Sequence, residues 1–305
     1  MDPLTHAVAG LALAALSGEP VSLTSPIYLG AMLGAMAPDL DIIYQLKGDM
    51  VYLKNHRGAS HGLFGLAFFS AAISLMLYLF FPAAALSSLF IWSFIGGMSH
   101  TLLDILNSYG ARCLAPFSQR NITVNLLTIF DPFLFIFFIL IILGHVQLGW
   151  SGITVYLLFR WIMSLKVRSY LHREFPNYER IVIMPAFSKN FSWSFLVDAG
   201  DMMFTGEIPF FNCSYKVFKK MAKQNDALAR LALQTPLGKL FTEFTPYFHI
   251  DLKKQKGRHV VRFFDLRYYT RKKFLHSATA IFDHNLVLQE SVFQPYNEDR
   301  RININ

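Results

Sequence analysis

Residues 61–107 decide the fold and read HGLFGLAFFSAAISLMLYLFFPAAALSSLFIWSFIGGMSHTLLDILN. No Asp, Glu, Lys or Arg occurs between residues 62 and 99, and Pro82 divides this run in the middle. The hydrocarbon layer of a bilayer needs about 20 apolar residues of helix to cross it. The stretch therefore predicts two membrane-spanning helices, at about 61–81 and 86–107, joined by a short apolar turn.

Four further apolar segments flank this pair, at residues 3–17, 26–46, 127–145 and 150–166. The first of them is short for a full span and predicts a partial or re-entrant helix. Hydrophobic residues make up 53% of the 305 residues, and the mean hydropathy is +0.36. We therefore expect an α-helical membrane bundle of about five to six membrane helices, which forms a first domain over residues 1–166.

The charge is divided unevenly along the chain. Residues 1–165 carry six Lys/Arg and seven Asp/Glu, whereas residues 166–305 carry 22 and 13, so the net charges are −1 and +9. Lys and Arg occur in the loops at 47–60 and 107–126 and after residue 165. By the positive-inside rule these segments are cytoplasmic, which predicts a multi-pass inner-membrane protein with both termini in the cytoplasm. Anionic membrane lipid suits the basic tail better than nucleic acid does, and no nucleic-acid partner is expected.

Residues 167–305 are expected to form a small, basic, cytoplasmic α+β domain with antiparallel strands. Residues 166–180 should continue the last membrane helix, and 181–211 alternates apolar residues with turn formers, which indicates strands. Apolar residues at helical spacing predict an amphipathic helix over 214–234. An antiparallel meander is expected from strands at 258–268, 274–283 and 286–293.

Histidines and aspartates gather where the apolar runs of the first domain begin or end. They are His6, Asp39, Asp41, His56, His61, His100, Asp104 and Asp131. Ionisable residues in membrane segments are costly and are therefore functional candidates. All eight fall at or near the cytoplasmic ends of the predicted helices, and this shared depth predicts one composite site.

Two pairs illustrate the geometry that this site requires. His100 and Asp104 are four residues apart, so both side chains share one face of an α-helix. Asp39 and Asp41 are two apart and would diverge by about 200° on a continuous helix. Either the helix is irregular there, or the two carboxylates serve different metals or different shells around one metal.

The segment Asn55-His56-Arg57-Gly58-Ala59-Ser60-His61 brings two histidines and an arginine together. Gly58 permits a tight turn, so that His56 and His61 can both point inward. The planar guanidinium of Arg57 suits a bidentate grip on a phosphate. We therefore expect Arg57 to hold the negative charge of a substrate, and Asp39 to accept a proton if it is not itself a ligand.

The ligand set indicates the kind of metal. Imidazole together with carboxylate suits Zn²⁺, Mn²⁺ or Fe²⁺, and eight residues exceed the three or four protein ligands that one zinc ion needs. We expect one or two divalent ions, with Zn²⁺ first and Mn²⁺, Fe²⁺ or Mg²⁺ as alternatives. Cys113 and Cys213 form no C-x-x-C pair, which argues against a thiolate site.

Structural roles compete with this interpretation. A single Asp at a helix end is often a cap, and Asp131-Pro132 fits an N-cap followed by a proline at the first helical position. His145 lies at the opposite end of the predicted bundle without a partner, and we expect it to take no part in the site.

The motifs resemble those of the YdjM-like family of inner-membrane proteins, in particular its YfhP-like branch. The resemblance covers about residues 1–165, and it is carried by Thr5-His6, Pro38-Asp39-Leu40-Asp41, Asn55-His56-Arg57-Gly58-Ala59-Ser60-His61, His100-Thr101-Leu102-Leu103-Asp104, Asn107-Ser108-Tyr109-Gly110 and Asp131-Pro132. It implies metal-dependent hydrolysis without naming a substrate.

Residues and resemblance together favour a membrane-bound metal-dependent hydrolase. Two-metal sites activate water and hold phosphoryl oxygens, so the expected substrate is a lipid-like phosphoester or ester at the cytoplasmic face of the membrane. One alternative is a metal-ion transporter or sensor, although polar residues in series across the bilayer are missing from the sequence. Another is a non-catalytic membrane regulator that uses its basic tail to bind a partner.

Overall fold

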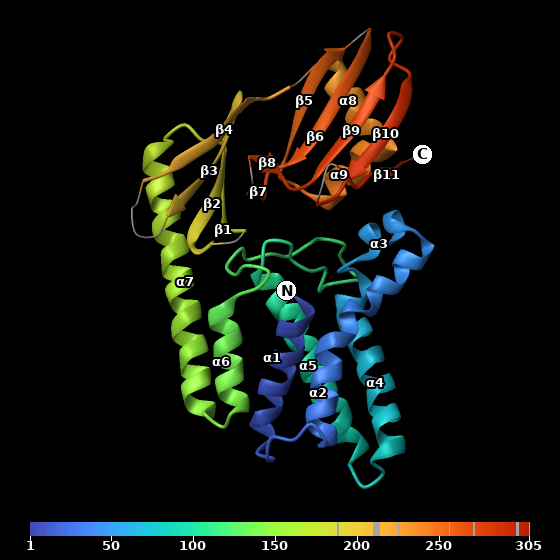
Figure 1. Cartoon of the computed structure of the whole chain (residues 1–305), viewed down its shortest axis with the longest axis vertical. Helices are drawn as coiled ribbons and strands as arrows, with labels where there is room; N and C mark the ends of the chain where they lie inside the picture. The colour runs from blue at the N-terminus through green and yellow to red at the C-terminus, as the bar shows by residue number, and fades with distance from the viewer. Residues whose placement is uncertain are drawn as a thin grey trace. The chain divides into compact units, whose positions relative to one another are not determined.

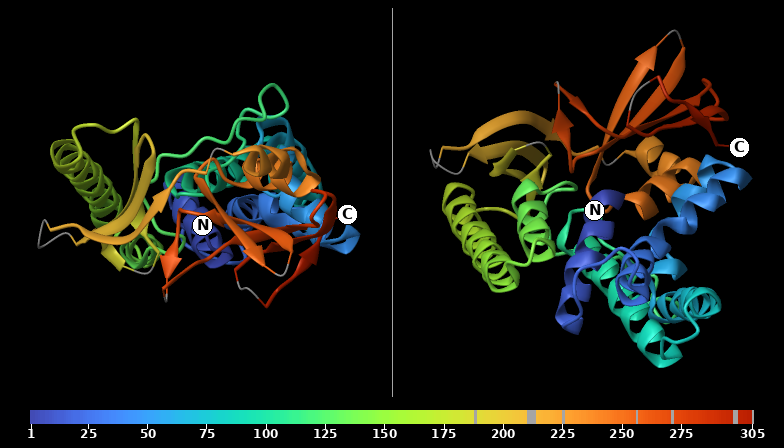
Figure 2. Two further views of the ribbon diagram at one scale, coloured as in Figure 1. Left: turned by 90° about the horizontal axis from the view of Figure 1, so that it is seen from above. Right: turned by 60° about the horizontal axis from the view of Figure 1, so that its bottom comes forward.

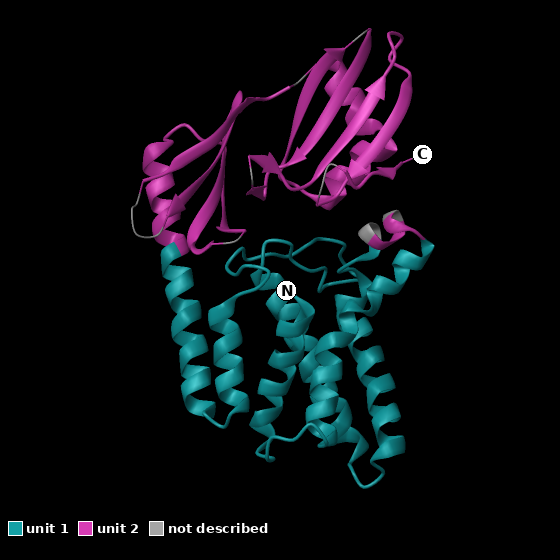
Figure 3. Cartoon of the chain, in the orientation of Figure 1, with its two compact units in different colours: residues 1–47, 55–163 teal, residues 48–54, 164–305 magenta. Residues whose placement is uncertain are grey.

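The computed structural model describes residues 1–187, 189–209, 214–224, 226–255, 257–270, 272–296 and 299–304, without the side chains of residues 50, 53 and 54. The chain forms two compact units, which Figure 3 shows in different colours. We call residues 1–47 and 55–163 the membrane unit, and residues 48–54 and 164–305 the tail unit.

The membrane unit is helical. Its elements are α1 (Pro3–Ala14), η1 (Ala15–Ser17), α2 (Pro26–Met36), η2 (Ala37–Lys47), η3 (Ala59–His61), α4 (Leu63–Phe80), α5 (Leu86–Leu106), α6 (Pro132–Ile142) and the first part of α7 (Val146–Glu174). The short helix α3 (Asp49–Asn55) lies almost wholly in residues assigned to the tail unit. Figure 1 shows the extended segment between α5 and α6 running across one end of the helices.

Four of the helical segments are long and apolar enough to cross a membrane: Pro26–Lys47, Leu63–Phe80, Leu86–Leu106 and Val146–Glu174. Pro3–Ser17 and Pro132–Ile142 are apolar but shorter. The predicted helical membrane bundle is therefore confirmed, with four segments of spanning length among the six predicted ones. The first segment is short, as its sequence predicts, because Gly18 adopts a left-handed backbone (φ 78°) and ends it.

Close backbone packing holds the centre of the membrane unit together. A Cβ atom placed on Gly34 of α2 would lie 2.0 Å from the carbonyl oxygen of Ser93, and one on Gly96 of α5 would lie 2.1 Å from that of Ala31. Small residues at helix interfaces in membranes allow backbones to approach in this way. The separation of α2 and α5 is thus set by direct contact of their main chains.

Pro38 explains the irregular helix that the Asp39–Asp41 spacing requires. A proline has no N–H to donate and its ring obstructs the preceding turn of an α-helix. In the structure α2 ends at Met36, and the chain continues as the 3₁₀ helix η2. The side chain of Asp41 is buried, whereas Asp39 is about one-quarter exposed.

In the described part of the tail unit two larger antiparallel sheets and one two-stranded sheet are present. One has the order β1-β2-β3-β4, formed by Arg180–Ala186, Lys189–Ala199, Met202–Pro209 and Lys216–Ala222. The other has the order β11-β10-β9-β6-β5, formed by Ile302–Asn303, Leu288–Gln294, Ser277–Phe282, Arg258–Asp265 and Phe248–Gln255. A two-stranded hairpin, β7 (Tyr269–Thr270) with β8 (Lys273–Phe274), lies between β6 and β9 in the chain. The expected α+β fold with antiparallel strands is confirmed.

Two helices cover one face of the five-stranded sheet (Figures 1 and 2), namely α8 (Ala227–Gln234) and α9 (Pro236–Phe244). Phe241 of α9 is fully buried against Phe263 and Phe293 of the sheet. Each helix begins with a side-chain cap, since Asp226 accepts from the amide of Ala229 and Thr235 from that of Gly238. The buried aromatic layer is the hydrophobic core of this part of the unit.

The prediction of one amphipathic helix over 214–234 is wrong. Its first part is the edge strand β4, which pairs with β3 so that Met221 lies opposite Met203. Helix begins only at Ala227, after the Asp226 cap. The apolar spacing in 217–221 fits a helix and a half-buried strand equally well, and the free edge of β3 decides between them. The sequence also failed to predict strand β5 and helix α9, and α7 ends at Glu174 rather than near residue 180.

Candidate metal centre

Seven of the eight predicted ligands converge at one end of the membrane unit. They form three overlapping groups whose ligand atoms lie within 4.8 Å of one another: His6, Asp39 and His100; His61, His100 and Asp104; and Asp39, Asp41 and His56. The residues come from α1, η2, the turn before η3, η3 itself and the last turns of α5. Segments up to about 100 residues apart in the chain thus supply one cluster, as their shared depth in the sequence predicts.

The side chains of His61 and His100 face each other with their Nε2 atoms 3.1 Å apart. His100 donates its Nδ1–H to the carbonyl of Ala35, at 2.7 Å. The hydroxyl of Ser60 donates to Oδ2 of Asp41 at 3.3 Å and shares a second hydrogen bond, of 2.9 Å, with Nδ1 of His61. With its proton on Nδ1, His100 presents the lone pair of Nε2 toward Nε2 of His61.

This arrangement fits a metal ion. A zinc–nitrogen bond is about 2.05 Å long, so two nitrogens on one tetrahedral zinc lie about 3.3 Å apart, close to the 3.1 Å between Nε2 of His61 and of His100. Metal-binding histidines commonly donate their second ring N–H to a carbonyl or a similar acceptor, which fixes the ring. His61 and His100 both have such a partner.

Asp104 supplies the carboxylate next to this histidine pair. It is fully buried, and its Oδ2 has no hydrogen-bond partner among the described residues. The same oxygen lies 3.5 Å from Nε2 of His61, 3.7 Å from Nε2 of His100 and 3.4 Å from Nε of Arg57. A buried carboxylate is costly unless its charge is balanced, and a cation bound between Asp104 and the histidines would add to the balance that Arg57 supplies.

A positively charged group already lies among these donors. The amino nitrogen of Met1 is 2.9 Å from Nε2 of His6 and also contacts Oδ1 of Asp104. Nδ1 of His6 is buried without a hydrogen-bond partner among the described residues, and its ring stacks on that of His100 with centroids 3.6 Å apart. The amino nitrogen of Met1 and the ring of His6 thus both lie within the candidate centre.

Asp41 and His56 are placed to orient the centre. Oδ1 of Asp41 accepts from Nδ1 of His56 at 2.9 Å, and Oδ2 accepts from the backbone N–H of Arg57 at 2.9 Å. Ser60 also donates to Oδ2. Because both oxygens of Asp41 hold hydrogen-bond donors, the carboxylate fits a positioning role behind His56 and His61 better than direct coordination.

Arg57 points into the cluster from a strained backbone. Its φ is 59°, a left-handed conformation that costs a non-glycine residue about 1 kcal/mol or more, and the bond from its N–H to Asp41 offsets part of that cost. Nη1 donates to Asn107 (3.3 Å) and to the carbonyl of Gly110 (3.2 Å), and the guanidinium lies over the ring of Tyr109. These contacts fix the side chain at the edge of the metal-ligand groups.

The structure gives Asp131 a different role from the predicted one. Its Oδ1 accepts from the amides of Phe133 and Leu134, and its Oδ2 from the hydroxyl of Tyr156 at 2.7 Å. Among the described residues it belongs to none of the three ligand groups. Asp131 is the N-cap of α6, where its carboxylate accepts from amides that have no acceptor within the helix.

Sequence reasoning assigned no role to Ser60 and Asn107, although both belong to the quoted motifs. Asn107 follows the last residue of α5 and donates to Oδ1 of Asp104 at 3.1 Å, while its own Oδ1 accepts from the amide of Tyr109. Its position three residues after a candidate ligand is the signal that could have found it. His145 is exposed and remains outside the cluster.

Known proteins resemble the chain over nearly its whole length. The family model described as YdjM inner membrane protein matches residues 1–175, and the one described as YfhP C-terminal alpha/beta plait domain matches residues 227–303. The curated protein "Uncharacterized protein YfhP" of Bacillus subtilis (strain 168) is 29% identical over 308 residues, which is 95% of this chain and 94% of that protein. No solved structure matches. The chain belongs to the YdjM family of inner membrane proteins.

Proposed function

We propose that this protein is a membrane-bound metal-dependent hydrolase that cleaves a lipid-borne phosphoester or ester at the cytoplasmic face of the membrane. The observation that carries the proposal is the pair of Nε2 atoms of His61 and His100, 3.1 Å apart, with the buried Oδ2 of Asp104 3.5 and 3.7 Å from them. Two imidazoles and one carboxylate are a ligand set of catalytic zinc sites.

The candidate ligands divide into a set for a first ion and a set for a second ion. His61, His100 and Asp104 would hold the first ion, with Asp39 nearby, since its Oδ1 lies 3.5 Å from Nε2 of His100. His6 with Asp39, and His56 with Asp39, offer positions for a second ion. Zn²⁺ suits this set best, and Mn²⁺, Fe²⁺ or Mg²⁺ are the alternatives. When bound, such an ion lowers the pKa of a water ligand to about 7 and polarises the bond that is to be cleaved.

The remaining residues would handle the proton and the charge. Asp39 is the only carboxylate of the three ligand groups that is appreciably exposed, at about 25% of its side chain, so it can exchange a proton with solvent. Arg57, held by Asn107 and Gly110, would face the negative charge of a phosphoryl or acyl group. Ser60 and Asp41 keep His61 and His56 in the required orientation.

The test measures metal content and hydrolysis on the same purified protein. We expect metal in the wild type together with hydrolysis of bis(p-nitrophenyl) phosphate or a p-nitrophenyl ester, and loss of both in His61→Ala and in His100→Ala. His145→Ala, the same substitution at an exposed histidine away from the cluster, is the matched control and should keep both.

The outcomes separate the proposal from its alternatives. Metal binding at His61 and His100 without turnover of either probe, or of phospholipid vesicles, would favour a metal sensor or a regulator. Metal-free protein that hydrolyses the probes as fast as metal-loaded protein would remove the metal from the proposed reaction.

A further inference from the structure

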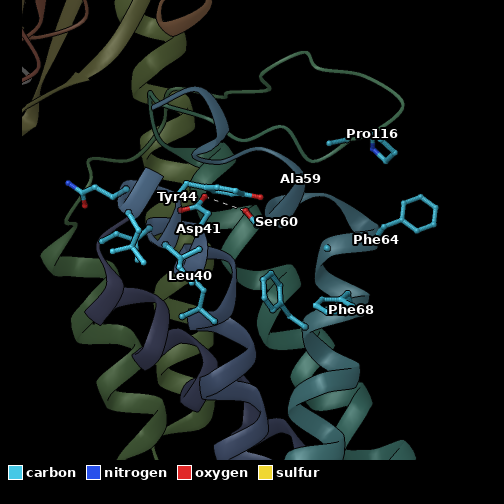
Figure 4. Close-up of a pocket in the computed structure, with 15 residues that line it drawn as sticks. Leu40, Asp41, Tyr44, Ala59, Ser60, Phe64, Phe68 and Pro116 are labelled. Carbon is cyan, nitrogen blue, oxygen red and sulfur yellow. Dashed lines mark hydrogen bonds between the residues drawn. The ribbon is translucent and has the colours of Figure 1, made fainter. Parts of the chain in front are cut away.

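A large apolar groove lies beside the metal centre within the membrane unit (Figure 4). Its volume is about 1080 Å³, at the upper end of the roughly 300–1,000 Å³ of small-molecule sites. Figure 4 shows Leu40 and Tyr44 of η2 on one side, with Phe64 and Phe68 of α4 on the other. Ala115 and Pro116, from the segment after α5, close it.

Two polar residues of the groove also belong to the candidate metal centre. Asp41 and Ser60 line it, and the dashed line in Figure 4 marks the hydrogen bond between them. Through Ser60 the groove wall contacts Nδ1 of His61, and through Asp41 it contacts Nδ1 of His56. A molecule lying in the groove would therefore have one end next to the proposed ligands.

The outer wall of the groove is part of a segment long and apolar enough to span the membrane. Phe64 is 59% exposed and Phe68 is 69% exposed, both on α4. On the other wall Leu40 and Ile43 of η2 are likewise more than half exposed. Contiguous exposed apolar surface of this kind marks contact with lipid or with a binding partner. Exposed apolar side chains of a segment long enough to span a membrane thus form part of the groove wall.

We infer that this groove holds the hydrocarbon chain of the substrate, which passes sideways from the bilayer and places its ester or phosphoester group at the metal centre. The inference rests on the proposed function and names its substrate class: a lipid with a long acyl or prenyl-like chain. A hydrocarbon chain that moves from the bilayer into the groove passes from one apolar environment to another. The groove would therefore position the substrate at the metal centre without adding much to its binding affinity.

A water-soluble substrate moves from water, rather than from lipid, into the groove. The contribution of the groove to its binding can therefore be measured. Each methylene that leaves water is worth about 0.8 kcal/mol, which corresponds to about fourfold in kcat/KM. We expect kcat/KM for p-nitrophenyl esters, or for matched alkyl p-nitrophenyl phosphates, to rise by up to that factor per methylene between two and eight carbons. All concentrations stay below micelle formation, and the full-length protein is used with its metal.

A filled groove should abolish this dependence. Ile43→Trp adds bulk to a lining residue and should flatten the rise with chain length. Ile162→Trp is the matched control, because Ile162 is also exposed and apolar but lies on α7 away from the groove. It should keep both the metal content and the slope of the wild type. A wild-type kcat/KM independent of chain length, or an equal slope in both variants, would overturn the inference.

A second readout does not depend on turnover. A fatty acid with a photoreactive diazirine near the end of its chain, in vesicles that contain the wild-type protein, should label η2 and the first half of α4. Labelling spread evenly over α4, α5 and α7 would overturn the groove as a chain site. If no probe is hydrolysed but this labelling is confined to the groove, the proposed function fails while the chain site stands.

Discussion

Two buried carboxylates, one in each unit, show the difference between a binding site and a structural ion pair. Asp265 of the tail unit is buried, and both of its oxygens accept from Arg267, with Thr245 donating to Oδ1 as well. Asp104 of the membrane unit is equally buried, yet its Oδ2 has no hydrogen-bond partner among the described residues. Asp265 pairs with one arginine and stabilises its fold, whereas Asp104 lies beside three histidines as well as Arg57, which is the donor set that the proposed metal ion would need.

The largest expected effect is on metal binding at Asp104. Asp104→Asn keeps the volume of the side chain but removes its charge, so metal affinity should fall by more than the about 10–100-fold that second-shell changes cost. Metal stoichiometry and affinity of the purified protein are the measurement. Asp265→Asn is the matched control and should leave metal content unchanged. Equal metal affinity in wild type and Asp104→Asn would place Asp104 with Asp265 as a structural group.

The second prediction concerns the stability of the tail unit. Arg267→Met leaves Asp265 buried with an unpaired charge, which costs about 3–5 kcal/mol. Hydrogen exchange of β6 and β9 in the full-length protein, followed by mass spectrometry, should show this loss. The double variant Arg267→Met with Asp265→Leu removes both charges and should recover most of it. If the single variant exchanges like the wild type, the pair does not stabilise the unit.

The third prediction is a dependence of the same strands on pH. Burial lowers the pKa of His276 from 6.5 to about 4, against Asp265, which raises it, and with Arg267, which lowers it further. Below pH 6.5 His276 binds a proton in the unfolded chain, whereas in the folded unit it stays neutral until about pH 4. Stability should therefore fall with decreasing pH across this window, by about 3 kcal/mol in all.

Hydrogen exchange, corrected for the intrinsic effect of pH, measures this change at β9 and β10. In the structure Nδ1 of His276 accepts from the amide of Tyr296, and a glutamine can accept in the same way. His276→Gln should therefore remove most of the pH dependence. A dependence of the same size in this variant would assign the change to other groups.

The smallest predicted effect concerns the helix caps. It tests whether a buried carboxylate that caps a helix takes any part in metal binding. Asp131→Ala removes the cap of α6 and should cost about 1–2 kcal/mol, because two amides and the hydroxyl of Tyr156 lose their acceptor. Metal content should stay at the wild-type value. Asp226→Ala, which removes the cap of α8, is a comparison in the tail unit. Loss of metal in Asp131→Ala would return Asp131 to the ligand set.

The sequence predicted the gathering of the ligands better than their roles. Their shared depth in the membrane was enough to predict that His6, His61 and His100 lie close together, because each lies where an apolar run begins or ends. Whether a carboxylate coordinates or orients depends on the donors around it, and those come from distant residues. Asp41 has its oxygens occupied by His56 and by the backbone of Arg57, a fact that no local pattern contains.

Strand β4 shows in the same way that contacts with distant residues cannot be predicted from local sequence. Helices α4 and α5 follow from long uncharged runs, whose length and composition leave one solution in a membrane. Residues 216–222 are short, and their apolar spacing fits two periods at once. Pairing with β3, whose partner residues lie 9 to 20 positions upstream in the chain, made them a strand. Local sequence therefore determines the membrane unit more completely than it determines the tail unit.

The close approach of α2 and α5 at their glycines also affects how far apart the candidate metal ligands lie, and therefore the radius of the ion that would fit between them. His100 lies one turn after Gly96 on α5, and Asp39 follows the end of α2, so the two main chains carry donors toward each other from a fixed distance. With a methyl group on Gly96, the 2.1 Å approach to Ala31 would have to open to an ordinary contact of at least 3.4 Å. Ions bound at about 2.0–2.1 Å, such as Zn²⁺ and Mg²⁺, would then fit less well than Ca²⁺ at about 2.3–2.6 Å. If the proposed ion binds here, the absence of side chains at Gly34 and Gly96 would thus influence which size of ion fits.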